Sequence, residues 1–238
     1  MNTAMNAALV PIKRLTTGKS RLEGALDRSQ LEALCLAMME DVLSALLEVD
    51  ALDRVIVATP DAAAAAAATA LGAEAFLGED PGLNTAIERG GERLAREGAG
   101  LVITVLGDVA GAEASDFAQL IDTTRALASQ HEGIAVGLAP SADGGTAALA
   151  RCPANAIEAR FGADSAALHR AECAKHGIPL GELDLPSLRL DLDREADIEA
   201  FLALERGGPR TRATLEAMSW RSRVADRNTG PAAKGTST

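Results

Sequence analysis

The amino-acid sequence predicts a Rossmann-like α/β fold, with a mostly parallel mixed central sheet covered by helices on both faces. Segments typical of strands and of helices alternate along nearly the whole chain, as they do in a parallel sheet with crossover helices. Aromatic residues make up only 2% of the 238 residues and Tyr is absent, so Leu, Val, Ile and Ala must fill the core. This composition favours helices packed on a sheet over an aromatic-rich β-sandwich.

The length and the end of the sequence predict a single domain followed by a tail. A chain of this size fits one large α/β domain better than two small ones. From Gly207 onward the apolar periodicity is lost, and the sequence ends in RNTGPAAKGTST. We therefore expect a folded domain over residues 1–206 and a mobile tail over residues 207–238.

In the first half of the chain, apolar and β-branched runs predict strands at 8–13, 54–59 and 74–77. Ser29-Gln30-Leu31-Glu32 has the spacing of a capping box and predicts the start of a helix that ends near Leu47. The Ala-rich run at 61–71 must be helical, because Ala has the best helix propensity and offers little to a sheet. A further helix is expected at 84–96, with Asn84 as its N-cap.

In the second half, the run LVITVL at 101–106 is almost wholly apolar, which is typical of a strand buried on both faces, and we expect it at the centre of the sheet. The remaining patterns predict strands at 134–139, 146–150 and 187–193, and helices at 115–129, 164–176 and 194–205. Ligands of such sheets bind beyond the C-terminal ends of the strands, so functional residues are expected directly after strands.

Charge and composition exclude several classes of partner. A formal net charge of -11 argues against nucleic acid and against an anionic membrane surface, because both need a basic field. No run approaches the roughly 18 apolar residues of a membrane-spanning helix, and the N-terminal apolar run precedes the basic residues, the reverse of a secretory signal. A cytoplasmic location is expected. Cys35, Cys152 and Cys173 are widely spaced, which favours buried thiols over a disulfide framework or a zinc site.

Four cations lie in the loop after the first predicted strand. Lys13, Arg14, Lys19 and Arg21 all precede the first acidic residue of the chain, Glu23. Cations beside a glycine suit a polyphosphate, because they neutralise its charge while the glycine lets the backbone approach. The spacing is not that of a P-loop, which gives an ATPase little support. A solvated basic loop explains the charges equally well.

Three carboxylates are candidates for holding Mg²⁺. Asp108 directly follows the predicted central strand, where a carboxylate can bind Mg²⁺ together with phosphate oxygens and water. Asp191 and Asp193 are two residues apart, so on an extended chain both point to one face, where a divalent cation would relieve their repulsion. The alternatives are that Asp108 belongs to an ordinary turn and that Asp193 caps the following helix.

Two glycine-bearing segments could bind an anion. Residues 143–146 (DGGT) and 161–165 (FGADS) could offer backbone N–H groups and hydroxyls, and the second opens a predicted helix, whose N-terminus attracts phosphate. His169 lies one turn into that helix, where packing is the favoured role and ligand binding the alternative.

Taken in order, these segments resemble those of one family, the 2-phospho-L-lactate guanylyltransferases of coenzyme F(420) biosynthesis. The similarity covers residues 8 to about 204, and its specificity lies in the combination of motifs rather than in any one of them. The motifs are Pro11-Ile12-Lys13, Gly18-Lys19-Ser20-Arg21-Leu22, Gly82-Leu83-Asn84, Leu106-Gly107-Asp108, Asp143-Gly144-Gly145-Thr146, Phe161-Gly162-Ala163-Asp164-Ser165 with His169, and Leu190-Asp191-Leu192-Asp193.

The resemblance implies a nucleotidyltransferase fold, a requirement for GTP and Mg²⁺, and transfer of GMP to a small phosphorylated acid. That acid is 2-phospholactate, phosphoenolpyruvate or 3-phosphoglycerate, and the three remain alternatives because discrimination at this scale depends on pocket shape. The oligomeric state stays open, and a homodimer is one alternative. By match to the motifs, the implied groups are Pro11, Lys13, Lys19, Arg21, Gly82 and Asn84 for the nucleotide, Thr146, Gly162 and Ser165 for the acceptor, Asp108, Asp191 and Asp193 for the metal, and Lys19, Arg21 and Asp108 for catalysis.

The chain departs from the family pattern at Leu106-Gly107-Asp108-Val109-Ala110-Gly111, where the family has a run of the Leu-Pro-Ala-Asp-Leu-Pro type. The Asp is kept and the prolines are lost, so we expect a looser loop around the metal. Two other functions stay open. Asp191-Leu192-Asp193 also matches the bare DxD of metal-dependent nucleotidyltransferases or glycosyltransferases, and the altered loop would suit a nucleotide-binding protein without turnover.

Overall fold

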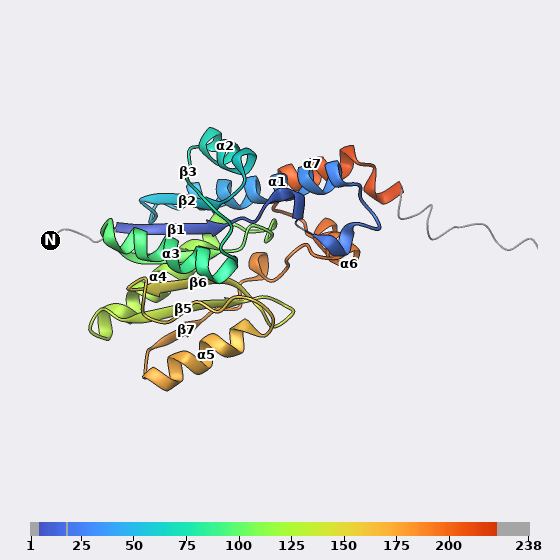
Figure 1. Cartoon of the computed structure of the whole chain (residues 1–238). Helices are drawn as coiled ribbons and strands as arrows, with labels where there is room; N and C mark the ends of the chain where they lie inside the picture. Colours follow the sequence, from blue (N-terminus) through green and yellow to red (C-terminus); the bar gives the residue numbers. More distant parts are fainter. Residues whose placement is uncertain (1–4, 18, 223–238) are drawn as a thin grey trace, which may run out of the picture.

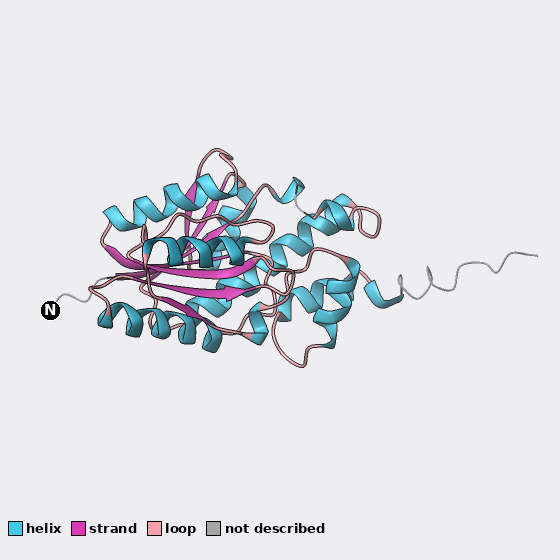
Figure 2. Cartoon of the chain, turned by 90° about the horizontal axis from the view of Figure 1, so that it is seen from below, coloured by secondary structure: helices cyan, strands magenta, loops and turns pink. Residues whose placement is uncertain are grey.

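The computed structural model describes residues 5–17 and 19–222, which form a mixed seven-stranded sheet between two layers of helices (Figures 1 and 2). The strand order is β3-β2-β1-β4-β6-β5-β7, and β6 alone runs antiparallel to its neighbours in this sheet. The expected mostly parallel sheet is confirmed. The strands are β1 (Met5–Pro11), β2 (Arg54–Thr59), β3 (Glu74–Leu77), β4 (Ala99–Val105), β5 (Ala135–Pro140), β6 (Thr146–Cys152) and β7 (Leu180–Glu182).

The helices cover both faces because alternate residues of each central strand point to opposite sides. From β1, Ala8 and Val10 pack into the core under α1, α2 and α4, whereas Ala7 and Leu9 pack on the side of α3. The helices are α1 (Arg28–Leu47), α2 (Ala62–Leu71), α3 (Leu83–Arg96), α4 (Ala114–Gln130), α5 (Ser165–His176), α6 (Glu195–Ala203) and α7 (Pro209–Ala217). No helix in the described part of the chain is long and apolar enough to cross a membrane.

The strand β4 is the middle strand of the sheet, as its apolar sequence predicts. Leu101 and Ile103 face the core under α1, α2 and α4, and Val102 faces the opposite side, all of them buried. Its C-terminal end therefore delivers the following residues, from Leu106 onward, to the middle of the carboxyl edge of the sheet.

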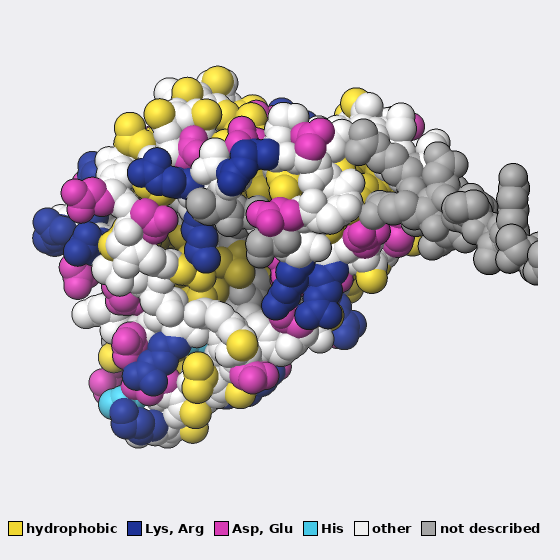
Figure 3. All heavy atoms as spheres, turned by 45° about the vertical axis from the view of Figure 1, so that its right-hand side comes forward, with side chains coloured by type: hydrophobic (Ala, Val, Ile, Leu, Met, Phe, Trp, Pro, Cys, Tyr) yellow, Lys and Arg dark blue, Asp and Glu magenta, His cyan; other side chains and the backbone are white. Residues whose placement is uncertain are grey.

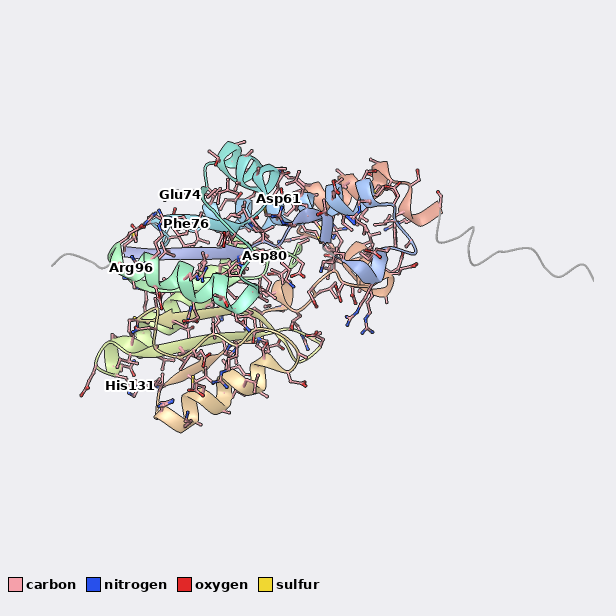
Figure 4. The ribbon with its side chains drawn as sticks, viewed as in Figure 1. Asp61, Glu74, Phe76, Asp80, Arg96 and His131 are labelled. Carbon is pink, nitrogen blue, oxygen red and sulfur yellow. The ribbon has the colours of Figure 1, made fainter. Side chains whose placement is uncertain are left out.

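The carboxyl edge is the end of the sheet at which β1 to β5 finish and the antiparallel β6 begins. In Figure 4, Asp61 after β2 and Asp80 after β3 lie at this end, whereas Arg96 at the end of α3 and His131 after α4 lie at the opposite end. The loops after β1, β4 and β5 therefore meet at one edge, as the parallel arrangement predicts.

Two helix caps differ from the prediction. The N-cap of α1 is Asp27, whose side chain accepts the Gln30 N–H, so the capping box begins two residues before Ser29. The N-cap of α3 is Gly82, with φ at +87°, and Asn84 lies inside the first turn. Asn84 instead makes contacts outside its helix, described below.

The predicted strand at 187–193 is wrong. A 3-10 turn at Pro186–Leu188 is followed by irregular chain up to α6, and the seventh strand lies earlier, at Leu180–Glu182. The segment crosses the carboxyl edge instead of joining the sheet, and the buried Leu188 and Leu192 anchor it there. Alternating leucines thus mark anchoring points rather than one face of a strand.

The predicted end of the folded domain at residue 206 is also wrong. The helix α7 packs along α1, and both Leu215 and Trp220 are only 1% exposed. The buried Asp41 of α1 accepts the N–H groups of Arg210 and Thr211 at the start of α7. Few apolar residues lie in this short helix, so periodicity alone does not reveal it. Residues 223–238 of the expected tail lie outside the described residues.

Candidate active site

A groove of three adjoining pockets runs along the carboxyl edge. Figure 3 shows it as a hollow with hydrophobic side chains on its floor and Lys and Arg side chains on its rim. The β3-side pocket lies between the loop after β3 and the start of α3, the central pocket between the basic loop and the end of β4, and the β6-side pocket beside the start of β6. Leu83 lines all three, Pro11 and Lys13 line the first two, and Leu106 the last two.

A charged cluster lies in the central pocket. The Lys19 ammonium is 2.6 Å from Asp108 Oδ2 and 3.5 Å from Asp193 Oδ1, and the Arg21 guanidinium is 2.5 Å from Asp193 Oδ2. Asp193 comes close to Asp108 because the Leu192 N–H donates to the Asp108 carbonyl and the Leu192 side chain is buried. The structure thus brings together the three predicted catalytic residues and Asp193, so that two of the three predicted metal ligands contact Lys19.

The charges of this cluster affect one another. Burial lowers the pKa of Lys19, but the charges of Asp108, Asp193 and Asp191 outweigh burial, so the pKa lies above its usual 10.5. Asp191 faces the β6-side pocket, where burial and the negative charges of Asp108 and Asp143 raise its pKa to about 6. Two carboxylates, Asp143 and Asp191, therefore line the β6-side pocket near Asp108.

The predicted metal ligands do not form a three-residue cluster within the described part of the chain. Among the described residues no group of three or more His, Cys, Asp or Glu side chains has the arrangement of a metal site. One observation still fits a cation: Asp108 Oδ1 is buried and has no hydrogen-bond partner within the part of the chain that the structure describes. A buried carboxylate oxygen without a donor beside a second desolvated carboxylate, Asp191, suits Mg²⁺.

The loop after β4 packs partly into the core, and its looseness relative to the family pattern stays a prediction. A side-chain carbon at Gly107 would lie 2.2 Å from Ile12 Cδ1, so the Ile12 side chain would have to move to admit it. Val109 and Ala110 are buried, and the Ala112 N–H closes a turn on the Val109 carbonyl. Two small apolar residues thus anchor the loop where the family pattern has proline.

The other basic residues line the groove from its exposed side. Lys13 is exposed and lies between the β3-side and central pockets, whereas Arg14 and Arg21 are exposed on the central pocket. Lys19 differs from them because its side chain is only 8% exposed and its backbone has φ at +59°. The loop therefore directs one buried and several exposed cations into one groove.

The predicted acceptor residues meet in a buried cluster beside the β6-side pocket. Ser165 Oγ donates to Thr146 Oγ1 at 3.0 Å, and Thr146 Oγ1 is 3.0 Å from His169 Nδ1. All three side chains are buried, and Thr146 and Gly162 line the pocket. His169 is thus packed, as favoured from the sequence, and burial followed by the charges of Arg151 and Arg160 lowers its pKa to about 4.

The two glycine-bearing segments differ in what they offer. In residues 143–146, the Gly144 N–H donates to the Ser141 carbonyl and the Gly145 N–H donates to Asp143 Oδ1, so the turn uses both groups itself. In residues 161–165, the Gly162 N–H donates to no acceptor in the part of the chain that the structure describes. The Gly162 N–H of the second segment is therefore a candidate donor at the pocket among the described residues.

Asn84 joins the two outer parts of the groove. Its Oδ1 accepts the Phe161 N–H at 2.8 Å and its Nδ2 donates to the Phe161 carbonyl at 3.1 Å. The structure therefore gives this predicted nucleotide-binding residue a contact with the loop that precedes α5. Gly82 and Pro11, also predicted for the nucleotide, do line the β3-side pocket.

Several pocket residues were not predicted from the sequence. Phe76, Asp80 and Arg93 line the β3-side pocket, where the Arg93 guanidinium stacks 3.7 Å from the centre of the Phe76 ring. Asp143 lines the β6-side pocket. The turn-rich run Gly78–Gly82 after β3 is the sequence signal that could have found the first group, since ligands bind after strands.

Comparison with known proteins identifies the family to which this chain is similar. The chain matches the family described as "Guanylyl transferase CofC like" over residues 6–224. It is 38% identical over 193 residues to phosphoenolpyruvate guanylyltransferase of Sphaerobacter thermophilus, a match that covers 81% of this chain and 90% of the relative. It is 34% identical over 208 residues to the protein of the same name from Conexibacter woesei, covering 84% and 90%.

Solved structures share the fold. A protein described as a nucleotide-diphospho-sugar transferase, from Desulfovibrio desulfuricans G20, superposes with a TM-score of 0.71 at 14% identity, covering 92% of this chain and 98% of that one. A nucleotidyl transferase from Methanothermobacter thermautotroptrophicus gives a TM-score of 0.59 at 16% identity, covering 84% and 96%. The chain therefore has a nucleotidyltransferase fold and belongs to the CofC-like guanylyltransferase family.

Proposed function

We propose that this protein transfers the guanylyl group of GTP to phosphoenolpyruvate and releases pyrophosphate, as a step of coenzyme F(420) biosynthesis in the cytoplasm. Family membership supports guanylyl transfer, and the relatives named phosphoenolpyruvate guanylyltransferase favour this acid over 2-phospholactate and 3-phosphoglycerate. The observation that carries the proposal is the arrangement of the groove, whose two outer pockets adjoin a central pocket with a buried lysine between two carboxylates.

Each pocket has a proposed occupant. The β3-side pocket, with apolar walls from Pro11, Phe76 and Leu83, suits the guanosine of GTP. The central pocket receives the triphosphate, because Lys13 at its entrance and Lys19 on its floor neutralise negative charge on the departing pyrophosphate. The β6-side pocket receives the phosphorylated acid at Thr146 and Gly162.

Asp108 and Asp191 are the residues that would hold Mg²⁺, with Asp193 beside them on the Lys19 side. Asp143 and Asp191 give the β6-side pocket negative charge, so an anionic acceptor fits there only when a cation compensates that charge. Bound Mg²⁺ would neutralise the phosphate oxygens of both substrates. The buried, unpartnered Asp108 Oδ1 supports this assignment.

The proposed reaction is an in-line displacement. An oxygen of the acceptor's phosphate bonds to the α-phosphorus of GTP, and the bond from that phosphorus to the oxygen bridging to the β-phosphate breaks. Pyrophosphate leaves with the electron pair. The attacking phosphate is already anionic, so the chain need not supply a strong general base, and Lys19 and Arg21 act by positioning and charge neutralisation.

Pyrophosphate release tests the proposal. Four nucleoside triphosphates are each mixed with phosphoenolpyruvate, 2-phospholactate and 3-phosphoglycerate in the presence of Mg²⁺, and the products are identified by mass. We expect release with GTP and phosphoenolpyruvate and a product carrying GMP. Release with none of the acids would favour a sugar-phosphate enzyme or a nucleotide-binding protein without turnover. Light scattering of the same sample tests whether the protein forms a homodimer.

A further inference from the structure

We propose that His169 is a positioning residue that fixes the Thr146 hydroxyl as a hydrogen-bond donor toward the acceptor. This inference rests on the proposed function of the β6-side pocket. It concerns the buried cluster of Thr146, Ser165 and His169, in which every contact is a hydrogen bond of 3.0 Å. The directions of the two His169 bonds follow from counting protons, and Ser165 Oγ is assigned as the donor to Thr146 Oγ1.

The backbone determines the tautomer of His169. The Arg160 N–H donates to His169 Nε2 at 3.0 Å, and a backbone N–H can only donate. Nε2 must therefore carry a lone pair, and in a neutral imidazole the proton then lies on Nδ1. The low pKa of His169, caused by burial and by the charges of Arg151 and Arg160, agrees with a neutral ring.

The protonated Nδ1 directs the Thr146 hydroxyl. Since Nδ1 donates, Thr146 Oγ1 accepts from His169, and it also accepts from Ser165 Oγ. Both acceptor sites of a hydroxyl oxygen are then used, and its own proton needs a partner outside the cluster. Thr146 lines the β6-side pocket, so an anionic oxygen bound there is the partner that its hydroxyl suits.

The opposite tautomer would remove this donor. With the proton on Nε2, the bare Nδ1 would accept the Thr146 O–H, and the hydroxyl would present a lone pair to an anion. In that tautomer the Nε2–H would also face the Arg160 N–H, so two donors would point at each other without an acceptor. The T-shaped contact of the ring with Phe161, 5.5 Å between centres, helps to hold it in the orientation that makes both bonds.

Two substitutions separate the two ring nitrogens. His169→Asn places an amide N–H near the Nδ1 position, and His169→Gln places a carbonyl oxygen near the Nε2 position without a donor to Thr146. We expect His169→Asn to retain the KM for phosphoenolpyruvate within about threefold. His169→Gln should raise it about 10- to 100-fold, the cost of losing one hydrogen bond to a charged group, with the KM for GTP unchanged. His176→Asn, on the exposed end of α5, is the matched control.

A double-substitution cycle tests whether His169 acts through Thr146. Thr146→Val removes the hydroxyl at nearly constant volume and should raise the KM for phosphoenolpyruvate by a similar factor. Once Thr146→Val is present, His169→Gln should add little further increase. Independent increases that multiply, or equal rises in the KM values of both substrates, would overturn the proposal.

The tautomer can be measured without turnover. Long-range proton–nitrogen correlation spectra of the full chain with labelled histidine, assigned with His131→Asn and His176→Asn, report which imidazole nitrogen carries the proton. We expect Nδ1–H at His169, and Nε2–H would overturn the inference. Absence of pyrophosphate release from the wild-type protein with any acid would refute the proposed function instead, and the tautomer result would remain.

Discussion

The amide of Asn84 makes two hydrogen bonds with the backbone of Phe161, accepting its N–H at 2.8 Å and donating to its carbonyl at 3.1 Å. These residues are 77 positions apart, and their contact ties the first turn of α3 to the loop that carries Gly162. These two bonds hold the loop in position relative to the β3-side pocket, where the proposed nucleotide site adjoins the groove.

Asn84→Ala should weaken acceptor binding more than GTP binding. Both hydrogen bonds to Phe161 are lost, at about 0.5–1.5 kcal/mol each, so we expect the KM for phosphoenolpyruvate to rise about tenfold. Steady-state kinetics with each substrate varied in turn measure the difference, and Asn155→Ala, at an exposed asparagine, is the control. A rise confined to the KM for GTP would show that Asn84 contacts the nucleotide directly, as the family resemblance implies.

Asp108→Asn should reduce pyrophosphate release to background while the fold persists. The substitution removes the negative charge that faces Lys19 at 2.6 Å and the buried oxygen assigned to Mg²⁺, but changes little volume. Circular dichroism and a melting curve verify folding, and Asp50→Asn, at an exposed aspartate before β2, should behave as wild type. Near wild-type turnover of Asp108→Asn at ordinary Mg²⁺ concentrations would refute its assignment as a ligand.

Lys19→Ala should lower kcat/KM for GTP by about 10- to 100-fold, because a charged hydrogen bond is worth about 1.5–3 kcal/mol. The order of preference among the three acids should not change, since Lys19 is proposed to contact the triphosphate that all three reactions share. Lys175→Ala, at an exposed lysine on α5, serves as the control. A shift in acid preference alone would place Lys19 at the acceptor instead.

Much of the fold and part of the site could be predicted because they depend on local patterns. The apolar run of β4 determines its central place, and its end delivers Asp108 to the carboxyl edge. Three features depend on tertiary contacts. Asp193 meets Lys19 where the Leu192 N–H donates to the Asp108 carbonyl, Thr146 on β6 bonds both Ser165 and His169 of α5, and Asp41 of α1 accepts two backbone N–H groups of α7. Strand and helix periodicity carry no information on such pairings.

Asp41→Ala should destabilise the protein without changing its turnover. Asp41 caps α7 by accepting the Arg210 N–H at 3.0 Å and the Thr211 N–H at 2.8 Å, and loss of such a cap costs about 0.5–2 kcal/mol. In a chain of this size each kcal/mol lowers Tm by about 2–4 °C. Asp41→Asn keeps one acceptor oxygen, so its Tm should lie between those of the wild type and of Asp41→Ala. An unchanged Tm for Asp41→Ala would contradict the docking of α7 on α1.

The free energy of unfolding should fall as the pH is lowered from about 6.5 to about 4, in part because of His169. Burial and the charges of Arg151 and Arg160 lower the pKa of His169 to about 4 in the folded protein, whereas an unfolded chain has a His pKa of about 6.5. Between these values the unfolded chain binds the extra proton, so acid favours unfolding, and the loss is complete below the folded pKa.

A pKa shift of this size lowers the free energy of unfolding by roughly 3 kcal/mol at the acid end of this pH range. His169→Asn lacks the titrating ring, so its free energy of unfolding should fall less over the same range, whereas the control His176→Asn should follow the wild type. Urea unfolding at a series of pH values gives the three curves. Carboxylates titrate equally in all three proteins, so the difference between the curves isolates the imidazole. Parallel curves for wild type and His169→Asn would show that the pKa of His169 is not lowered in the folded protein and would contradict the burial of the ring.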